Sequence, residues 1–366
     1  MRIAYVTLHW PRTQKSGVGK KIAGQLRAWA ERGHDVQLFM HLPASAVSAE
    51  LIPGKLFAFR APEGGGGLGV EVERIRAAAR LVQAAEDYRP DIIYLRYGIY
   101  VFPVHRLTSI APTVEEINTN DLTQHDALGR VTSAYNRRTR GLLLRRVAGL
   151  VAVSHELAGD EAFVRYGKPT LVLANGIDLE SVVPLPAPAN QEPRLAFIGS
   201  PGNVWHGVDK LVDLARAHPD LAVEIIGYDS LPEFAPLPGN LKLNGFLDAS
   251  QYRRVLAGCD VAVSSLALHR VGLDEASPLK SRECLALGLP LVSAYRDTDL
   301  DGLDCDALLR IPNQEDNIQK HGDRIRDFAY RMRGRRVERS LILPIDEHQK
   351  EARRLEFLSQ IAGVSS

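Results

Sequence analysis

The sequence has no apolar run of about 20 residues, the length that a membrane-spanning helix needs. Residues 1–7 instead run directly into a strand pattern with no apolar leader, so we expect neither a secretion signal nor a spanning helix. Cysteine is scarce as well: only Cys259, Cys284 and Cys305 occur, and their spacing fits no metal site. We therefore expect reduced, buried thiols and a cytoplasmic protein.

An excess of one charge is also missing. The chain has 45 Lys and Arg against 44 Asp and Glu, a formal net charge of +1, so its global charge gives no reason to expect a nucleic-acid partner. Its hydrophobic share of 45% and charged share of 24% are those of a soluble globular protein. A length of 366 residues is long for a single core and suits two domains.

Two nucleotide-binding fingerprints fail in the stretch Ser16-Gly-Val-Gly-Lys-Lys21. A P-loop would need a glycine at position 14 and a Ser or Thr at position 21. The dinucleotide pattern G-x-G-x-x-G fails because Ile22 takes the place of the third glycine, which argues against a nicotinamide-dependent dehydrogenase. Glycines between a strand and a helix still let backbone N–H groups approach an anion, so Gly17 and Gly19 are candidate site residues, with plain turn glycines as the alternative.

Apolar runs of strand length alternate with helical periodicity in the first half of the chain. The pattern predicts strands at 3–8, 35–40, 91–96 and 112–118 and helices at 20–32 and 70–88. This order is typical of a parallel sheet, whose ligands bind outside the carboxyl ends of the strands. Glu116, Asn118 and Asn120 lie at such an end and are candidate binding residues.

The second half repeats the same order after a linker. Residues 184–193 are rich in proline and lack periodicity, which marks a boundary between domains. A strand at 195–199, a glycine-containing loop and a helix at 208–217 follow, so the chain predicts two Rossmann-like halves. The loop offers a further phosphate cradle, to which Ser200, Gly202 and His206 would contribute.

The stretch from Glu275 to Val292 carries the most chemical signals. Ser277 is a good N-cap and Pro278 suits the first helical position. The N–H groups at this helix start form an anion site, where the helix dipole disfavours the cation of Lys280 by roughly 0.3–1 kcal/mol unless an anion binds. Glu283 lies on the same helical face as Lys280, and an exposed Lys–Glu pair on an ordinary helix is the alternative interpretation.

Glu275 and Glu283, separated by seven residues and followed by Cys-Leu-Ala-Leu-Gly-Leu-Pro-Leu-Val, resemble the E-x7-E signature of glycosyltransferase family 4. These enzymes are retaining glycosyltransferases with the GT-B fold. The resemblance covers most of the chain and is clearest for residues 260–295. It implies that Glu275 lies by the transferred sugar, that Glu283 binds the nucleotide ribose, and that the segment between them faces the sugar and the diphosphate, through Ser277, Pro278, Leu279 and Lys280.

The resemblance also implies roles elsewhere in the chain. Gly17 and Gly19 would lie by the donor phosphates and the acceptor, and the turn of Gly245 and Phe246 would meet the nucleotide base. The carboxyl end of the strand at 112–118 would face the acceptor, through Glu116, Asn118 and Asn120.

The chain departs from the family pattern at its phosphate-binding positions. Relatives usually have an Arg and a Lys where this chain has Ser200 and His206, so Lys210 or Lys280 would supply the missing cation. The loop after Glu275 is Ala-Ser-Pro-Leu-Lys instead of a small Gly-Phe-Gly-type loop, which leaves the donor-sugar contacts open. No histidine stands at the strand end around residue 118, where many relatives have one.

An arginine-rich stretch lies at residues 135–150, where five arginines alternate with Leu and Val. Basic amphipathic helices can lie on anionic membranes, and many enzymes of this kind glycosylate lipid-linked acceptors at the inner membrane face. Segment 137–146 is thus a candidate for peripheral membrane contact, with a solvated helix packed on the core as the alternative.

We therefore expect an α/β protein with two Rossmann-like domains facing across a cleft. Residues 1–180 would bind the acceptor, 181–345 the nucleotide sugar, and 346–366 would form a helix that crosses back to the first domain. The expected reaction moves a sugar from a nucleotide diphosphate sugar to a hydroxyl of a sugar or lipid-linked acceptor, with retention and with no cofactor or metal, in cell-surface polysaccharide or glycolipid synthesis. A nucleotide-sugar epimerase of the same fold and a catalytically silent nucleotide-sugar-binding protein are the alternatives.

Overall fold

The computed structural model describes residues 1–8, 17–47, 52–60, 68–126 and 129–364. Residues 9–16, the first part of the loop predicted before the first helix, lie outside this range. The chain forms two compact units, one of Met1–Ala174 with Glu347–Ser366 and the other of Asn175–Asp346. We call these units the first and second domain; the boundary falls at residue 174 rather than at the predicted 180.

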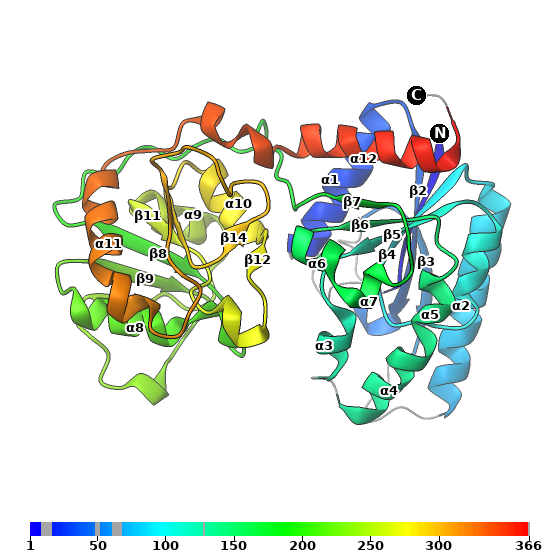
Figure 1. Ribbon diagram of the computed structural model, residues 1–366, viewed down its shortest axis with the longest axis horizontal. Coiled ribbons are helices and arrows are strands. Elements are labelled where there is room, and N and C mark those ends of the chain that lie inside the picture. Colours follow the sequence, from blue (N-terminus) through cyan, green and yellow to red (C-terminus); the bar gives the residue numbers. More distant parts are fainter. Residues whose placement is uncertain (9–16, 48–51, 61–67, 127–128, 365–366) are drawn as a thin grey trace. The chain divides into compact units, whose positions relative to one another are not determined.

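The first domain is built on a seven-stranded sheet in the order β3-β2-β1-β4-β5-β6-β7 (Figure 1). All neighbouring strands pair in parallel. The strands are β1 (Arg2–Thr7), β2 (Asp35–Pro43), β3 (Lys55–Phe59), β4 (Ile92–Arg96), β5 (Thr113–Ile117), β6 (Gly149–Ala152) and β7 (Thr170–Val172). The sequence pattern did not predict β3, a strand of five exposed or half-buried residues at the edge of the sheet.

Helices cover both faces of this sheet. On one face, α1 (Gly17–Glu31) and α12 (Glu347–Ala362) pack their apolar sides, including Trp29 and Leu355, against β1, β2 and β4. The opposite core is covered by α2 (Leu68–Tyr88), η2 (Val104–Ser109), α5 (Gly141–Leu144), α6 (His155–Gly159) and α7 (Glu161–Val164). The remaining helical segments are η1 (Ala44–Ala46), α3 (Asp121–Asp126) and α4 (Arg130–Thr139). The C-terminal helix therefore completes the first domain, although a whole second domain precedes it in the chain (Figure 1).

The second domain repeats this architecture on a six-stranded parallel sheet in the order β10-β9-β8-β11-β13-β15. The strands are β8 (Arg194–Ile198), β9 (Ala222–Ile226), β10 (Leu241–Leu243), β11 (Val261–Val263), β13 (Leu291–Ser293) and β15 (Leu308–Arg310). A separate short pair joins β12 (Glu275–Ala276) to β14 (Arg296–Asp297). The helix predicted at 208–217 is found at these bounds.

Two helical layers cover the second sheet as well. One core lies under α8 (Val208–Ala217) and α11 (Asn317–Met332), and the other under α9 (Ala249–Ala257), α10 (Leu279–Ala286) and η6 (Arg339–Ile345). Short 3-10 turns complete the domain, at η3 (Val204–His206), η4 (Pro232–Phe234) and η5 (Leu268–Val271).

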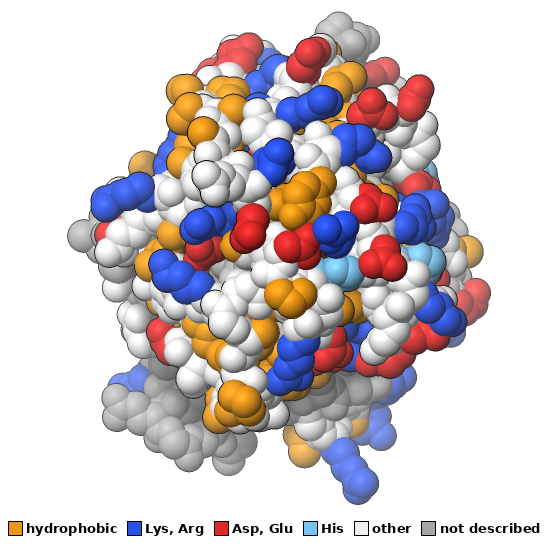
Figure 2. Space-filling view, turned by 90° about the vertical axis from the view of Figure 1, so that its left-hand side faces the viewer, with side chains coloured by type: hydrophobic (Ala, Val, Ile, Leu, Met, Phe, Trp, Pro, Cys, Tyr) orange, Lys and Arg blue, Asp and Glu red, His pale blue; other side chains and the backbone are white. Residues whose placement is uncertain are grey.

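The three cysteines are free thiols buried in the second domain. Burial raises the pKa of Cys259 to about 12, so this thiol stays protonated and inert. Among the helices that the structure describes, none combines the length and the apolarity that crossing a bilayer requires. The face shown in Figure 2 carries Lys and Arg side chains mixed with Asp and Glu, so that face has no broad field of one sign.

Candidate functional site

The carboxyl ends of β8, β9 and β10 meet in tightly packed glycine turns. A Cβ on Gly227, whose φ is +93°, would lie 2.2 Å from the carbonyl oxygen of Gly199, so only glycine fits there. The N–H of Gly227 donates to the carbonyl of Gly245, 2.7 Å away, and Gly245 itself has a φ of +60°. The strand β10 ends at Leu243 because the chain turns at Gly245, and Phe246 next to it is 68% exposed.

The loop after β8 encloses a neutral histidine. The Nδ1 atom of His206 lies 3.5 Å from the backbone nitrogen of Ser200 and 3.2 Å from the hydroxyl oxygen of Tyr228, which donates to the carbonyl of Ser200. Burial lowers the pKa of His206 to about 4, and the nearby charge of Lys280 contributes to this shift. Gly202 in the same loop has a φ of +84° and open space around it.

The start of α10 carries no side-chain cap. Pro278, predicted at the first helical position, is itself the N-cap residue, and α10 begins at Leu279. The prediction that Ser277 is the N-cap is wrong because the Ser277 hydroxyl accepts from the backbone N–H of Asn175, 3.2 Å away. The backbone carbonyl of Ser277 also accepts from the side-chain amide of Asn175. The first N–H groups of α10 are therefore available to a ligand.

Lys280 and Glu283 flank this helix start. Lys280 is half-buried, burial lowers the pKa of its ammonium, and no carboxylate of the described chain lies within salt-bridge distance of it. Glu283 lies one turn later, beside Tyr252, whose pKa is raised by burial first and then by Cys284 and Glu283. A half-buried cation at a helix start is unfavourable without an anion, so this end of α10 has the character of an anion site.

Glu275 lies on β12, immediately before α10, and is 5% exposed. Its strand is held by the parallel pair with β14, in which Glu275 stands opposite Arg296. The two glutamates and Lys280 are therefore carried by one continuous, well-packed segment.

Residues that the sequence did not single out anchor this segment. The guanidinium of Arg282 is fully buried and binds both oxygens of Asp297, at 2.5 and 2.7 Å, and Asp299 at 3.0 Å. On the preceding residue, the Ser281 hydroxyl lies 2.7 Å from that of Ser264. A buried ion pair of this geometry fixes the orientation of α10, and only the Asp-x-Asp pattern after β13 hints at it in the sequence.

Lys210, predicted as a possible phosphate-binding cation, binds groups of the protein itself. Its ammonium is buried on α8 and donates to the carbonyls of Gln314 and Glu315 and to the side chain of Asn317. These three hydrogen bonds occupy the ammonium of Lys210 and fasten α8 to residues 312–317. Lys280 is therefore the better candidate for a phosphate-binding cation.

In the first domain, Glu116 is the centre of a buried ion network. Its carboxylate lies 2.8 Å from Lys21, 2.7 Å from Arg96 and 3.5 Å from Arg354 of α12. Burial by itself would raise the pKa of Glu116, but these three cations hold it well below its usual range. Glu116 is fully buried by these contacts, which give it a structural role, and a contact with the acceptor stays a prediction.

Asn118 and Asn120 also make local contacts. Asn118 accepts from Lys21 at 3.1 Å and donates to Glu116 at 3.2 Å. Asn120 accepts from the N–H of Leu122 and so caps α3. Both side chains are half-buried at the carboxyl end of β5, as the sequence predicts.

Gly17 and Gly19 lie in the first turn of α1 rather than in a loop. The helix begins at Gly17 instead of the predicted residue 20, since a first turn tolerates glycine where no intrahelical donor is needed. Gly17 is exposed and Gly19 is buried. Both therefore lie at the N-terminal end of α1, the end of a helix that favours anions.

The arginine-rich segment divides into buried and exposed parts. Arg140 is 5% exposed and binds both oxygens of Asp121 at 2.7 Å. The other arginines of 137–146 are exposed, close to Tyr135 and Leu142, which are 38% and 40% exposed.

Comparisons with known proteins place this geometry in context. Residues 15–181, a little under half of the chain, match the family model Glycosyltransferase Family 4. None of the curated proteins matches the sequence.

Solved structures match nearly the whole chain. The lipopolysaccharide outer core galactosyltransferase WaaB has a TM-score of 0.68 and 12% identity, with 98% of this chain and 99% of that chain covered. HepE from Anabaena, in complex with UDP and glucose, has a TM-score of 0.62 and 16% identity over 98% and 99%. A UDP-GlcNAc 2-epimerase from Neisseria meningitidis, bound to UDP-GlcNAc, has a TM-score of 0.54 and 11% identity over 98% and 100%. At these identities the likeness establishes the fold only. It confirms the predicted α/β class with two Rossmann-like domains, as found in GT-B glycosyltransferases.

Proposed function

From the family 4 match of residues 15–181 and the geometry of the second domain, we propose that the protein is a glycosyltransferase that uses a nucleoside diphosphate sugar. The observation that carries this proposal is the uncapped start of α10, where Lys280 has no carboxylate partner among the described residues and Glu275 and Glu283 lie on either side of it in the chain. A diphosphate would accept from the free N–H groups and offset the charge of Lys280.

Each residue of this segment then has a distinct task. Glu283 accepts hydrogen bonds from the ribose hydroxyls, and Glu275 positions the transferred sugar. The turn of Gly245 and Phe246 supports the base, since its exposed ring can stack on a flat heterocycle. The diphosphate leaves toward Lys280, which lowers the barrier by stabilising the charge that develops on the leaving group.

We propose that transfer retains the configuration at the sugar carbon. The acceptor oxygen attacks from the face that the diphosphate leaves, within an oxocarbenium-like ion pair. The bond to the leaving oxygen breaks, the bond to the acceptor oxygen forms, and the departing phosphate takes the acceptor proton. Two points support this proposal. The sequence resembles a retaining family, and Glu275 is the one carboxylate that we assign to the transferred sugar, whereas a double displacement would need a pair of carboxylates.

A Glu275→Gln variant tests this assignment. We expect it to bind the nucleotide as the wild type does but to lose transfer, because the amide keeps the shape and removes the negative charge near the sugar. Glu233→Gln, an exposed residue of the same domain, is the matched control. Unchanged transfer in Glu275→Gln would contradict the proposal that Glu275 positions the transferred sugar.

An epimerase is the second candidate, since the structure of a UDP-GlcNAc 2-epimerase has the same fold. The two reactions differ in their need for an acceptor. NMR of a donor mixture without acceptor distinguishes them: conversion of the donor sugar would favour the epimerase, and an unchanged donor that reacts only with acceptor would favour transfer. Binding without either reaction would favour a silent nucleotide-sugar-binding protein.

We also propose that the first domain meets an anionic membrane and that the acceptor is lipid-linked, as in cell-surface glycolipid or polysaccharide synthesis. The exposed arginines of segment 137–146 support this, because they combine positive charge with the exposed side chains of Tyr135 and Leu142. Co-sedimentation with vesicles containing phosphatidylglycerol tests it. We expect binding that falls in Arg137→Glu/Arg138→Glu and is absent with phosphatidylcholine alone; equal binding to both vesicle types would contradict the proposal.

A further inference from the structure

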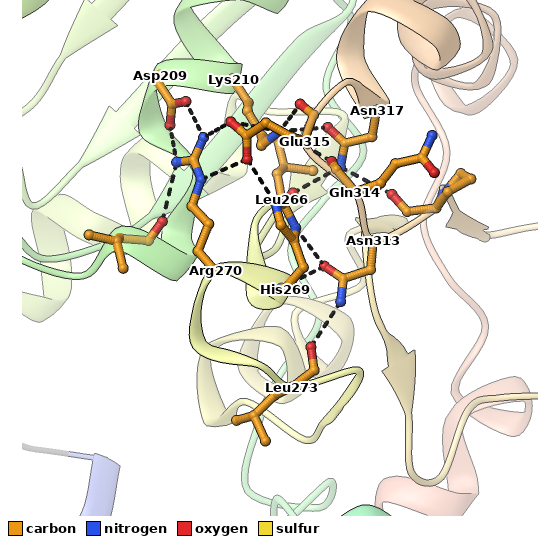
Figure 3. A network of polar contacts seen from close by, with 12 residues as sticks. Asp209, Lys210, Leu266, His269, Arg270, Leu273, Asn313, Gln314, Glu315 and Asn317 are labelled. Atoms are coloured by element: carbon orange, nitrogen blue, oxygen red, sulfur yellow. Dashed lines mark hydrogen bonds and ion pairs between the residues drawn. The ribbon is translucent and has the colours of Figure 1, made fainter. Parts of the chain in front are cut away.

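Residues 312–317, in the loop after β15 and at the first position of α11, are fastened to the segment that leads to Glu275 (Figure 3). The amide nitrogen of Asn317 donates to the carbonyl of Leu266, 2.9 Å away. The amide nitrogen of Asn313 donates to the carbonyl of Leu273 at 2.9 Å and to the carboxylate of Asp274 at 2.7 Å. The loop therefore holds segment 266–274 at both ends.

Backbone groups fix the orientation of the Asn313 amide. Its oxygen accepts from the backbone N–H of His269 at 2.9 Å, and its nitrogen faces the backbone carbonyl of Leu273. A backbone N–H can only donate and a carbonyl can only accept, so the amide cannot be reversed without losing both bonds.

The ring of His269 lies between two acceptors. Its Nδ1 lies 3.1 Å from the oxygen of Asn313, and its Nε2 lies 2.7 Å from a carboxylate oxygen of Glu315 (Figure 3). A neutral imidazole has a single N–H and can donate to only one of them, whereas an imidazolium donates to both. We infer that His269 and Asn313 are positioning residues for the segment that carries Glu275. Together with Glu315 they form a brace between residues 312–317 and segment 266–274. This brace is complete only when both ring nitrogens of His269 hold a proton.

Charged groups on the neighbouring elements complete the brace. Arg270 binds both oxygens of Asp209 on α8, at 2.8 and 2.6 Å, and also binds Glu315. Its hydrogen bonds, together with that of His269, lower the pKa of Glu315 to about 2, so the carboxylate that faces His269 stays ionised. Lys210 lies 3.8 Å from the same carboxylate. When His269 loses a proton, one of its two donations disappears while the carboxylate keeps its charge, and the loop loosens from the segment before Glu275.

Hydrogen exchange tests the brace without reference to catalysis. In His269→Gln, which lacks the two ring nitrogens, we expect the protection factors of residues 270–276 to be roughly tenfold lower than in the wild type. His321→Gln, a histidine of α11 in the same domain, should behave as the wild type. Wild-type protection in His269→Gln would overturn the inference.

Kinetics tests the link to Glu275, which rests on the proposed function. Asn313→Asp keeps the oxygen that faces His269 but loses the donations to Leu273 and Asp274. We expect kcat to fall about tenfold, with the KM for the donor within about twofold, because the segment is displaced while the nucleotide contacts remain. An unchanged kcat would overturn the positioning role. If the wild type has no transfer activity at all, the proposed function fails, while the exchange result still decides whether the brace exists.

Discussion

Glu115 has an unusual environment among the buried residues, because neither oxygen of its carboxyl has a hydrogen-bond partner. Burial raises its pKa to about 8, with Asp121 adding to the shift and Arg140 opposing it. The folded-state pKa lies above the ordinary value of 4.5, so the folded protein binds the proton more tightly than the unfolded chain. The free energy of unfolding therefore falls as the pH rises from about 4.5 to 8 and stays low above that range.

A Glu115→Gln variant should abolish this loss of stability. We expect it to be more stable than the wild type by roughly 2–4 kcal/mol at pH 9 and nearly equal to it at pH 4.5, where both side chains are neutral. Urea unfolding at the two pH values measures the difference, with Glu86→Gln on the exposed side of α2 as the control. The same dependence on pH in wild type and variant would contradict this prediction.

Lys280 gives a second prediction at the residue scale. A Lys280→Met variant should weaken the binding of a nucleoside diphosphate by roughly tenfold to a hundredfold, the effect of losing one charge-assisted hydrogen bond, and should leave the binding of the nucleoside nearly unchanged. Titration calorimetry with both ligands separates the two effects. Lys242→Met, an exposed lysine of β10, is the control, and an equal loss for nucleoside and diphosphate would argue against a phosphate contact.

The helix α12 illustrates stabilisation at the scale of the element. Glu351 accepts from the indole of Trp29 on α1 at 2.7 Å and binds Arg354 through both of its oxygens, at 2.8 and 3.1 Å. Arg354 then reaches Glu116 on β5, so one buried chain of charges fastens the C-terminal helix to the first sheet. This coupling explains why a segment that follows the second domain folds with the first.

Glu351→Gln should therefore weaken the docking of α12. Breaking a buried ion pair costs about 3–5 kcal/mol, because Arg354 would keep its charge with less compensation. Urea unfolding followed by tryptophan fluorescence measures the change, and limited proteolysis within 347–362 should become faster. Glu356→Gln, exposed on the same helix, is the control. Stability equal to the wild type would show that the ion pair contributes nothing to docking.

The sequence predicted elements better than it predicted contacts. The strands and helices of both domains follow from apolar periodicity, a local property, and most were placed within a few residues. Ser277 failed as an N-cap because Asn175, about a hundred positions earlier, takes its hydroxyl. The ion network of Glu116 was not predicted because Lys21, Arg96 and Arg354 come from three other elements. Such pairings depend on the tertiary fold, which no spacing rule contains.

At the scale of the whole molecule, the repeat of strand, glycine turn and helix in both halves predicted two parallel-sheet domains, and the structure has them. Local patterns could not predict the composition of the phosphate-binding end of the second domain. Ser200 and His206 lie there, His206 is held neutral, and Lys210 is used to fasten a loop. The proposed diphosphate contact consequently depends on Lys280 and on the N–H groups of α10.

Thermal unfolding with a panel of nucleoside diphosphates and their sugars tests this most directly. A ligand present at a hundred times its dissociation constant should stabilise the folded protein by about 2.7 kcal/mol. We expect one diphosphate nucleotide to raise the Tm of the wild type and of the control Glu233→Ala, and to have little effect on Glu283→Ala. No shift with any nucleotide, or an equal shift in Glu283→Ala, would contradict the proposal that this segment binds the donor.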